Sequence, residues 1–170
     1  MSQDEQARRW IDDLHLQPHP EGGFFREVYR SRDIIPKSAL PPGFRGDRSL
    51  ATSIFYLLGQ DDFSAFHRIL SDETWHFYAG GPLELYTLSS SSLSVITLGT
   101  QPEKEQQLQY TIPARTWFAA RPCPGTSYTL AGCCVSPGFD FDDFEMGDRD
   151  ALCDAFPHAA EVIRTLTRVA

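Results

Sequence analysis

FSAFHRILSDETWHFYAG, residues 63–80, is a stretch in which metal-ligand residue types, strand-forming residues and turn signals coincide. Its first part alternates like a β-strand with His67 on one face, and residues 70–72 (LSD) are typical of a turn. The β-branched and aromatic run that follows Glu73 predicts a second strand, which ends at Gly80. We therefore expect a β-hairpin that brings His67 and Glu73 together in an apolar pocket of a β-barrel.

His76 joins this pocket only if a bulge or an offset turns it inward, because strict alternation places Glu73 and His76 on opposite faces of the strand. With His76, two imidazoles and a carboxylate suit a divalent metal ion such as iron, manganese, zinc or nickel. Without His76, the side chains of His67 and Glu73 form an acid–base pair in which the carboxylate orients the imidazole. A buried pair with a purely structural role is the third interpretation.

The spacing His67-x-Ile69-x3-Glu73-x6-Gly80 resembles the first motif of the cupins, His-x-His-x3-Glu-x6-Gly, with isoleucine in place of the second histidine. In metal-dependent cupins, this motif and a later Pro-x-Gly-x2-His motif together hold a metal ion. The corresponding segment here is PARTWF, residues 113–118, with arginine for the glycine and phenylalanine for the histidine. Half of the usual four-ligand set is therefore missing.

Further segments extend the resemblance to the cupin 5 family (DUF985). They are HPEGGFFREVYRS (19–31), ATSIFYLL (51–58), residues 63–80, PARTWFAA (113–120) and SPGFDFDDFE (136–145), within roughly residues 10–146. Several segments in the right order are more specific than one motif. The resemblance implies a double-stranded β-helix (jelly-roll) barrel that is often dimeric, and similarity to sugar epimerases and isomerases of the cupin superfamily.

The rest of the chain also predicts an all-β fold with short N- and C-terminal helices. Turn signals recur about every ten residues, and helical periodicity is confined to residues 3–14 and 148–168, where Pro157 interrupts it. Residues 32–48 contain three prolines and two glycines, and they predict a long loop. In residues 136–145 we expect the phenylalanines to seal the core and the aspartates to be solvated.

The whole chain, residues 1–170, predicts one domain with its barrel at about residues 20–146 and a C-terminal helical extension at 148–168. The net charge of −8 and the pI near 5.0 argue against nucleic acid and membranes as partners, since both attract basic surfaces. With no signal peptide and no long apolar run, a cytoplasmic protein is expected. The four cysteines show no Cys-x2-Cys pairing and are expected to be reduced thiols.

Two functions from different classes follow for a small-molecule ligand. The first is a carbohydrate isomerase or epimerase that abstracts a proton next to a carbonyl group, with His67 as base and Glu73 as its orienter. The alternative is a non-catalytic sugar-binding or metabolite-binding protein. Side chains expected to contact the ligand are those of Arg26, Glu27, Tyr29, Arg68, Trp75, Tyr86 and Trp117.

Two further expectations concern the N-terminal part of the chain. His19 is expected to be a loop histidine that bonds the backbone rather than a ligand. We also expect a homodimer, because the strand FFREVYR, residues 24–30, exposes an edge that a second copy can cover.

Overall fold

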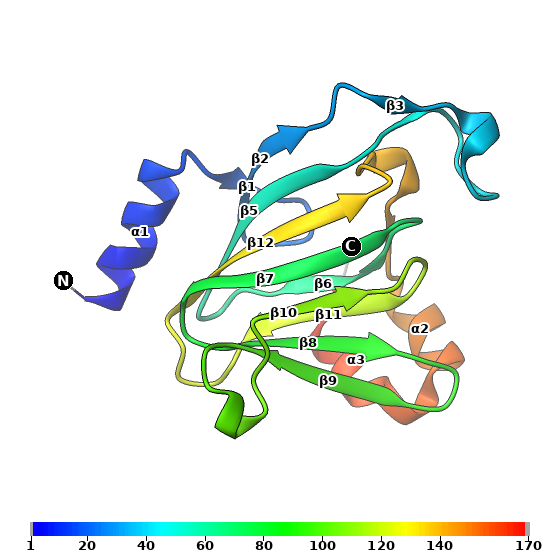
Figure 1. The fold of residues 1–170 in the computed structure, drawn as a ribbon. Helices are drawn as coiled ribbons and strands as arrows, with labels where there is room; N and C mark the ends of the chain where they lie inside the picture. The colour runs from blue at the N-terminus through cyan, green and yellow to red at the C-terminus, as the bar shows by residue number, and fades with distance from the viewer. Residues whose placement is uncertain (1, 169–170) are drawn as a thin grey trace.

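The structure is a computed structural model that describes residues 2–168, and its main feature is two antiparallel β-sheets that pack face to face (Figure 1). The jelly-roll class expected from the sequence is confirmed by this arrangement. The expected domain includes residue 1 and residues 169–170, which lie outside the described residues.

Each large sheet joins strands that lie far apart in the sequence. In spatial order, the six-stranded sheet contains β1 (Gln17–Pro18), β2 (Phe24–Arg30), β5 (Thr52–Gly59), β12 (Tyr128–Ser136), β7 (Asp72–Gly80) and β10 (Gln109–Ile112). The five-stranded sheet contains β13 (Glu145–Met146), β6 (Ser64–Arg68), β11 (Trp117–Pro122), β8 (Leu83–Leu88) and β9 (Leu93–Leu98). A two-stranded sheet pairs β3 (Ile34–Ile35) with β4 (Arg48–Ser49).

Helices lie at both ends of the chain, as the periodicity predicts. They are α1 (Gln3–Asp13), α2 (Arg149–Ala155) and α3 (Ala160–Thr165), with 3-10 turns η1 (Lys37–Ala39), η2 (Pro102–Lys104), η3 (Phe141–Asp143) and η4 (Pro157–Ala159). A capping box of Ser2 and Glu5 starts α1. No helix among the described residues is both long and apolar enough to cross a membrane.

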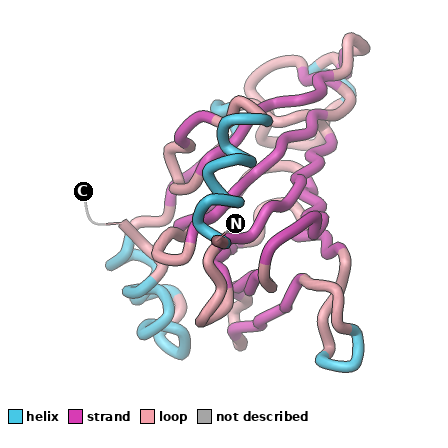
Figure 2. Tube along the Cα trace, turned by 90° about the vertical axis from the view of Figure 1, so that its left-hand side faces the viewer, coloured by secondary structure: helices cyan, strands magenta, loops and turns pink. Residues whose placement is uncertain are grey.

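These helices cover the outer faces of the two large sheets, and Figure 2 shows α1 well separated from the C-terminal helices. Trp10 of α1 packs in a cluster with Leu130 of the six-stranded sheet. On the other sheet, Ile163 of α3 packs in a cluster with Phe66 and Ala119. The helices therefore leave the space between the sheets to strand side chains.

The main core lies between the two sheets and draws inward-facing residues from both. Its buried members are Tyr56, Leu58, Trp75, Leu83, Leu85, Leu98, Ile112, Phe118, Ala120, Ala131 and Cys133. Strand alternation explains the set, since side chains two positions apart share a face. This apolar core fills one part of the space between the sheets and leaves a cavity in another.

The prediction that residues 63–80 form a β-hairpin is wrong, because their two strands do not pair with each other. Strand β6 pairs with β11 and β13, whereas β7 pairs with β12 and β10. The connection between β6 and β7 therefore crosses from one sheet to the other, and Ile69 and Ser71 within it are buried. His67 and Glu73 consequently approach one cavity from opposite sheets.

Residues 32–48 are more ordered than the loop that their prolines and glycines predict. The segment contains β3 and reaches the start of β4, where Arg48 donates two hydrogen bonds of 2.6 Å to the carboxylate of Asp143. Both side chains of this ion pair are almost completely buried. The expectation that the aspartates of residues 136–145 are solvated is therefore wrong for Asp143. This carboxylate is buried because Arg48, from a distant part of the chain, balances its charge.

Candidate functional site

A cavity of about 240 Å³ opens between the two sheets. Its walls come from the loop before β2, from residues of the five strands β2, β5, β6, β7 and β12, from the connection between β6 and β7, and from the segment after β12. The lining residues are His19, Glu21, Phe25, Glu27, Arg30, Thr52, Ile54, His67, Ile69, Glu73, Cys133, Val135, Phe139, Asp140, Phe141 and Phe144. Titratable groups concentrated in a concave, partly aromatic site are typical of a ligand-binding or active site.

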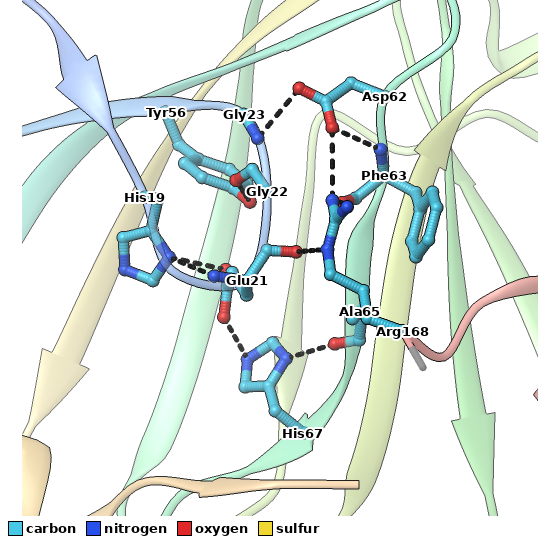
Figure 3. A network of polar contacts seen from close by, with 10 residues as sticks. All are labelled: His19, Glu21, Gly22, Gly23, Tyr56, Asp62, Phe63, Ala65, His67 and Arg168. Atoms are coloured by element: carbon cyan, nitrogen blue, oxygen red, sulfur yellow. Dashed lines mark hydrogen bonds and ion pairs between the residues drawn. The ribbon is translucent and has the colours of Figure 1, made fainter. Parts of the chain in front are cut away.

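The centre of the site is an ion pair between Glu21 and His67 (Figure 3). His67 Nε2 lies 3.1 Å from Glu21 Oε2, and both side chains are buried. The other ring nitrogen, Nδ1, lies 2.7 Å from the carbonyl oxygen of Ala65. The Ala65 amide in turn donates to the backbone carbonyl of Glu21, over 3.1 Å. These contacts form a closed ring between the Glu21 loop and β6.

This geometry dictates where protons can lie. A carbonyl oxygen only accepts, so His67 Nδ1 must carry a proton and donate it to Ala65. The Nε2–Glu21 contact then needs one further proton, held either by the imidazole or by the carboxyl group. His67 and Glu21 therefore share one proton inside the cavity, in addition to the proton on His67 Nδ1.

His19 contacts the same carboxylate from the other side. Its Nδ1 accepts a hydrogen bond from the Glu21 amide over 3.2 Å and lies 3.7 Å from Glu21 Oε1. Burial lowers the pKa of His19, and the negative charge of Glu21 offsets part of that effect. A neutral ring with Nδ1 as acceptor carries its proton on Nε2. The expected backbone contact of His19 is present, and His19 also lines the cavity.

Glu73 is the second carboxyl group of the site, and it comes from β7 in the facing sheet. Burial raises its pKa to about 8, with a further upward contribution from the charge of Glu21. Glu73 is therefore mostly a neutral carboxylic acid at neutral pH. Cys133 lies beside it, and burial also raises the pKa of this thiol, so that Cys133 is not a thiolate nucleophile.

Arg30 and Glu27, two charged groups farther out, are already paired with each other. Arg30 donates two hydrogen bonds to the Glu27 carboxylate, of 2.9 and 2.7 Å, and one to the Phe139 carbonyl. Asp140 lines the cavity near this pair and adds a further negative charge. The guanidinium of Arg30 is thus engaged before any ligand arrives.

Aromatic rings form one wall of the cavity. Phe139, Phe141 and Phe144 pack edge to face, with ring centroids 5.0 to 6.4 Å apart. The Phe144 ring also stacks on His67 at 5.3 Å. This wall offers an apolar surface directly beside the ion pair.

The structure brings only part of the expected catalytic set together. His67 and Glu73 both line the cavity, but His76 does not. The register shift between β7 and β12 falls after Phe77, so Glu73 and His76 keep opposite faces of the strand. The carboxylate in contact with His67 is that of Glu21, rather than that of Glu73.

Of the side chains expected to contact the ligand, Glu27 lines the cavity. Trp75 is buried in the main core. The remaining five lie elsewhere: Arg26 and Tyr29 are not part of the lining, Arg68 stacks over Trp117 and pairs with Glu145, and Tyr86 packs beneath the C-terminal helices.

Sequence reasoning missed Glu21. This glutamate lies between Pro20 and Gly22, in a segment without strand or helix periodicity, and glycines and prolines there predict only a loop. The available signal was an acidic residue two positions after a histidine within HPEGGFF, part of one of the segments that carry the family resemblance.

The solved structures that resemble this chain at low identity include proteins described as cupins. A cupin 2 domain-containing protein from Halorhodospira halophila superposes with a TM-score of 0.54 at 10% identity, covering 91% of this chain and 88% of its own. Oxalate decarboxylase from Bacillus subtilis gives 0.54 at 12% identity, covering 92% of this chain and 37% of its own. These likenesses show the fold alone.

The family follows from closer matches. The profile of the Cupin superfamily (DUF985) matches residues 8–147, so the chain belongs to this family, cupin 5. A hypothetical protein from Leishmania major is 31% identical with a TM-score of 0.87, covering 96% of this chain and 99% of its own. A protein from Shewanella oneidensis is 36% identical with a TM-score of 0.85, covering 96% and 98%. No curated protein matches the chain significantly.

Cupins often bind a metal ion, but the donor set of this cavity does not fit the usual site. Both ring nitrogens of His67 are engaged, by Ala65 and by Glu21. Ile69 lines the cavity where the second histidine is expected, and the Phe118 ring centroid lies 4.2 Å from that of His67. Within residues 2–168, no group of three or more His, Cys, Asp or Glu is arranged to hold a metal ion.

Proposed function

We propose that the protein is an isomerase or epimerase that moves a proton next to the carbonyl group of a small, carbohydrate-like molecule. One observation carries the proposal: the cavity holds a buried carboxylate–imidazole pair opposite a neutral carboxylic acid. Two carboxyl groups whose surroundings favour different protonation states are a common basis for acid–base catalysis.

The geometry suggests a role for each group. Glu21 takes the proton from the carbon next to the carbonyl group, because its Oε2 is close to His67 Nε2, at 3.1 Å, whereas its Oε1 lies 3.7 Å from His19 Nδ1. His67 positions the Glu21 carboxylate and stabilises its charge. Glu73 donates its proton to the carbonyl oxygen, which gives an enediol. In an isomerisation, Glu21 then gives its proton to the former carbonyl carbon while Glu73 takes a proton from the hydroxyl group of the neighbouring carbon. In an epimerisation, the enediol turns over before Glu21 and Glu73 reverse their first transfers.

The charge distribution favours an uncharged substrate. Arg30, a cation of the cavity wall, is held by Glu27 and Phe139, and neither Arg26 nor Arg68 lines the cavity. The surroundings that raise the pKa of Glu73 also disfavour a phosphate or carboxylate group of a ligand. The phenylalanine wall can pack against the C–H face of a sugar.

Deuterium exchange tests the proposal. Free aldoses and ketoses, each with its phosphate ester, are incubated with the protein in deuterated water and followed by NMR. We expect deuterium to enter next to the carbonyl group of an unphosphorylated sugar. Glu21→Gln should lower that rate by about 100-fold or more, because general acid–base groups contribute on this scale. The exposed Glu145 provides the matched control, Glu145→Gln, which should exchange normally.

Two results would contradict this assignment: exchange confined to the phosphate esters, or exchange that Glu21→Gln leaves unchanged. The alternative function is a non-catalytic sugar-binding protein, favoured by the phenylalanine wall and by an Arg30 that is already locked in place. Such a protein would show saturable binding of a sugar by calorimetry and no deuterium incorporation.

We also propose a homodimer that forms through the edge of β2. Strand β1 pairs only with Phe24 and Phe25, so the rest of this edge has no partner strand among the described residues. Val28 and Tyr29 of the edge are 40% and 56% exposed, which suits an interface with a second copy. Sedimentation should give twice the chain mass of 19.2 kDa, and Tyr29→Glu should give monomers. A wild-type monomer at micromolar concentration would refute the proposal.

A further inference from the structure

The loop that carries Glu21 is held against the turn before β6. Gly22 has φ of +119°, and a Cβ atom there would lie 2.1 Å from the Phe63 carbonyl oxygen. Only glycine therefore allows so close an approach. The Gly23 amide donates to Asp62 Oδ2 over 2.8 Å, and the Tyr56 hydroxyl donates to the Gly22 carbonyl over 2.6 Å.

Arg168, near the C-terminus, holds both sides of this contact (Figure 3). Its Nε donates to the Glu21 carbonyl over 3.3 Å, and its Nη2 donates to the Phe63 carbonyl over 3.2 Å and to Asp62 Oδ1 over 3.4 Å. The guanidinium carbon also lies 4.6 Å from the centre of the Phe63 ring. Arginine is suited to this position, because its planar fork can bond several acceptors while it stacks on an aromatic ring.

The residues just before Arg168 are tied to β6 itself. The Leu166 carbonyl accepts a hydrogen bond of 2.8 Å from the amide of Phe66, the neighbour of His67. Thr167 is held in turn by Arg149, whose side chain donates to the Thr167 hydroxyl and carbonyl over 2.8 and 2.6 Å. The C-terminal segment thus contacts the chain beside His67 through its backbone and the Glu21 loop through Arg168.

From these contacts we propose that residues 166–168 form a strap that positions Glu21 against His67, with Arg168 as the positioning residue. The Glu21 carbonyl accepts from both Ala65 and Arg168, so the strap holds in position the carbonyl group that closes the ring of contacts around the ion pair. Arg168 itself does not line the cavity. The functional importance of the strap rests on the proposed role of Glu21 as the base. The effect of the strap on the Glu21–His67 pair does not depend on that role.

Substitution of Arg168 by Gln tests the strap without any substrate. The first measurement is the ¹⁵N NMR spectrum of the His67 ring, which reports where its protons lie. The second is the titration of the Glu73 side-chain carbon by ¹³C NMR, which senses the charge of Glu21. We expect Arg168→Gln to change both signals in the direction of Glu21→Gln, and Arg168→Lys to restore part of the wild-type signals.

The matched control is Arg164→Gln, which changes an exposed arginine of the neighbouring helix α3 and should leave both signals as in the wild type. The proposal is overturned if Arg168→Gln leaves the His67 and Glu73 signals unchanged, or if Arg164→Gln moves them equally. Failure of the strap and failure of the proposed function are distinguishable. Deuterium exchange by the wild type and by Glu21→Gln tests the function alone.

Discussion

Replacing Glu73 by Gln is expected to stabilise the protein by as much as about 5 kcal/mol above about pH 8. The reason is the difference between the pKa of about 8 in the folded protein and the ordinary value of 4.5. Between these values the folded protein keeps a proton on Glu73 that the unfolded chain releases. The unfolded state then binds fewer protons, so this group makes the free energy of unfolding fall as the pH rises. Gln is uncharged at every pH and lacks this penalty.

Urea unfolding at several pH values between about 4.5 and 9 measures the effect. The free energy of unfolding of the wild type should decline through this range relative to that of Glu73→Gln, and the two should converge near pH 4.5. The exposed variant Glu145→Gln should follow the wild type. A constant difference between wild type and Glu73→Gln across the range would show that the carboxyl group of Glu73 has an ordinary pKa.

Substitution of Asp143 by Ala is expected to destabilise the protein by about 3 to 5 kcal/mol. Its carboxylate is the partner of Arg48, and the two side chains are only 3% and 4% exposed. Without Asp143 a buried guanidinium keeps its charge and loses two hydrogen bonds. The β3–β4 sheet and the phenylalanine wall of the cavity meet at this pair, so we expect both to loosen.

The exposed ion pair between Arg68 and Glu145 supplies the comparison for this prediction. Glu145→Ala removes a carboxylate of the same kind from the surface and should cost about 1 kcal/mol or less. Urea unfolding of the two variants at one pH measures both changes. Equal losses for Asp143→Ala and Glu145→Ala would mean that the Arg48–Asp143 pair is open to water.

Charge and burial together explain why the site contains so few free ionic groups. The carboxylate of Glu21 is balanced by His67, the carboxylate of Glu27 by Arg30, and Glu73 avoids a charge by keeping its proton. Burial makes an unbalanced charge costly, so these three carboxyl groups are either paired or neutral, whereas Asp140 at the cavity wall accepts a hydrogen bond from the Asp142 amide. The cavity therefore favours a ligand that binds through hydrogen bonds and apolar contacts over a charged ligand.

Much of the fold could be predicted because it depends on local patterns. Alternation in residues 63–80 correctly placed His67 and Glu73 on inward faces, and periodicity located the terminal helices together with the break at Pro157. The position of His76 on the other face of β7 also follows from alternation alone. A side chain's direction within a strand is set by its immediate neighbours, and no distant contact is needed to predict it.

Strand pairing and the partners of buried charges could not be predicted in this way. A turn at residues 70–72 is compatible with a hairpin or with a crossing between sheets, and only the pairing of β6 with β11 and of β7 with β12 distinguishes them.

The sequence by itself therefore determined the jelly-roll class, the family and the inward direction of His67 and Glu73. The tertiary structure decided that Glu21 is the partner of His67, that Arg48 neutralises Asp143, and that Arg168 reaches back to the Glu21 loop. The physical reason is the separation along the chain over which each effect acts. Periodicity reports which face a side chain occupies, but an ion pair forms between whichever opposite charges folding brings to within about 4 Å, however far apart they lie in the chain.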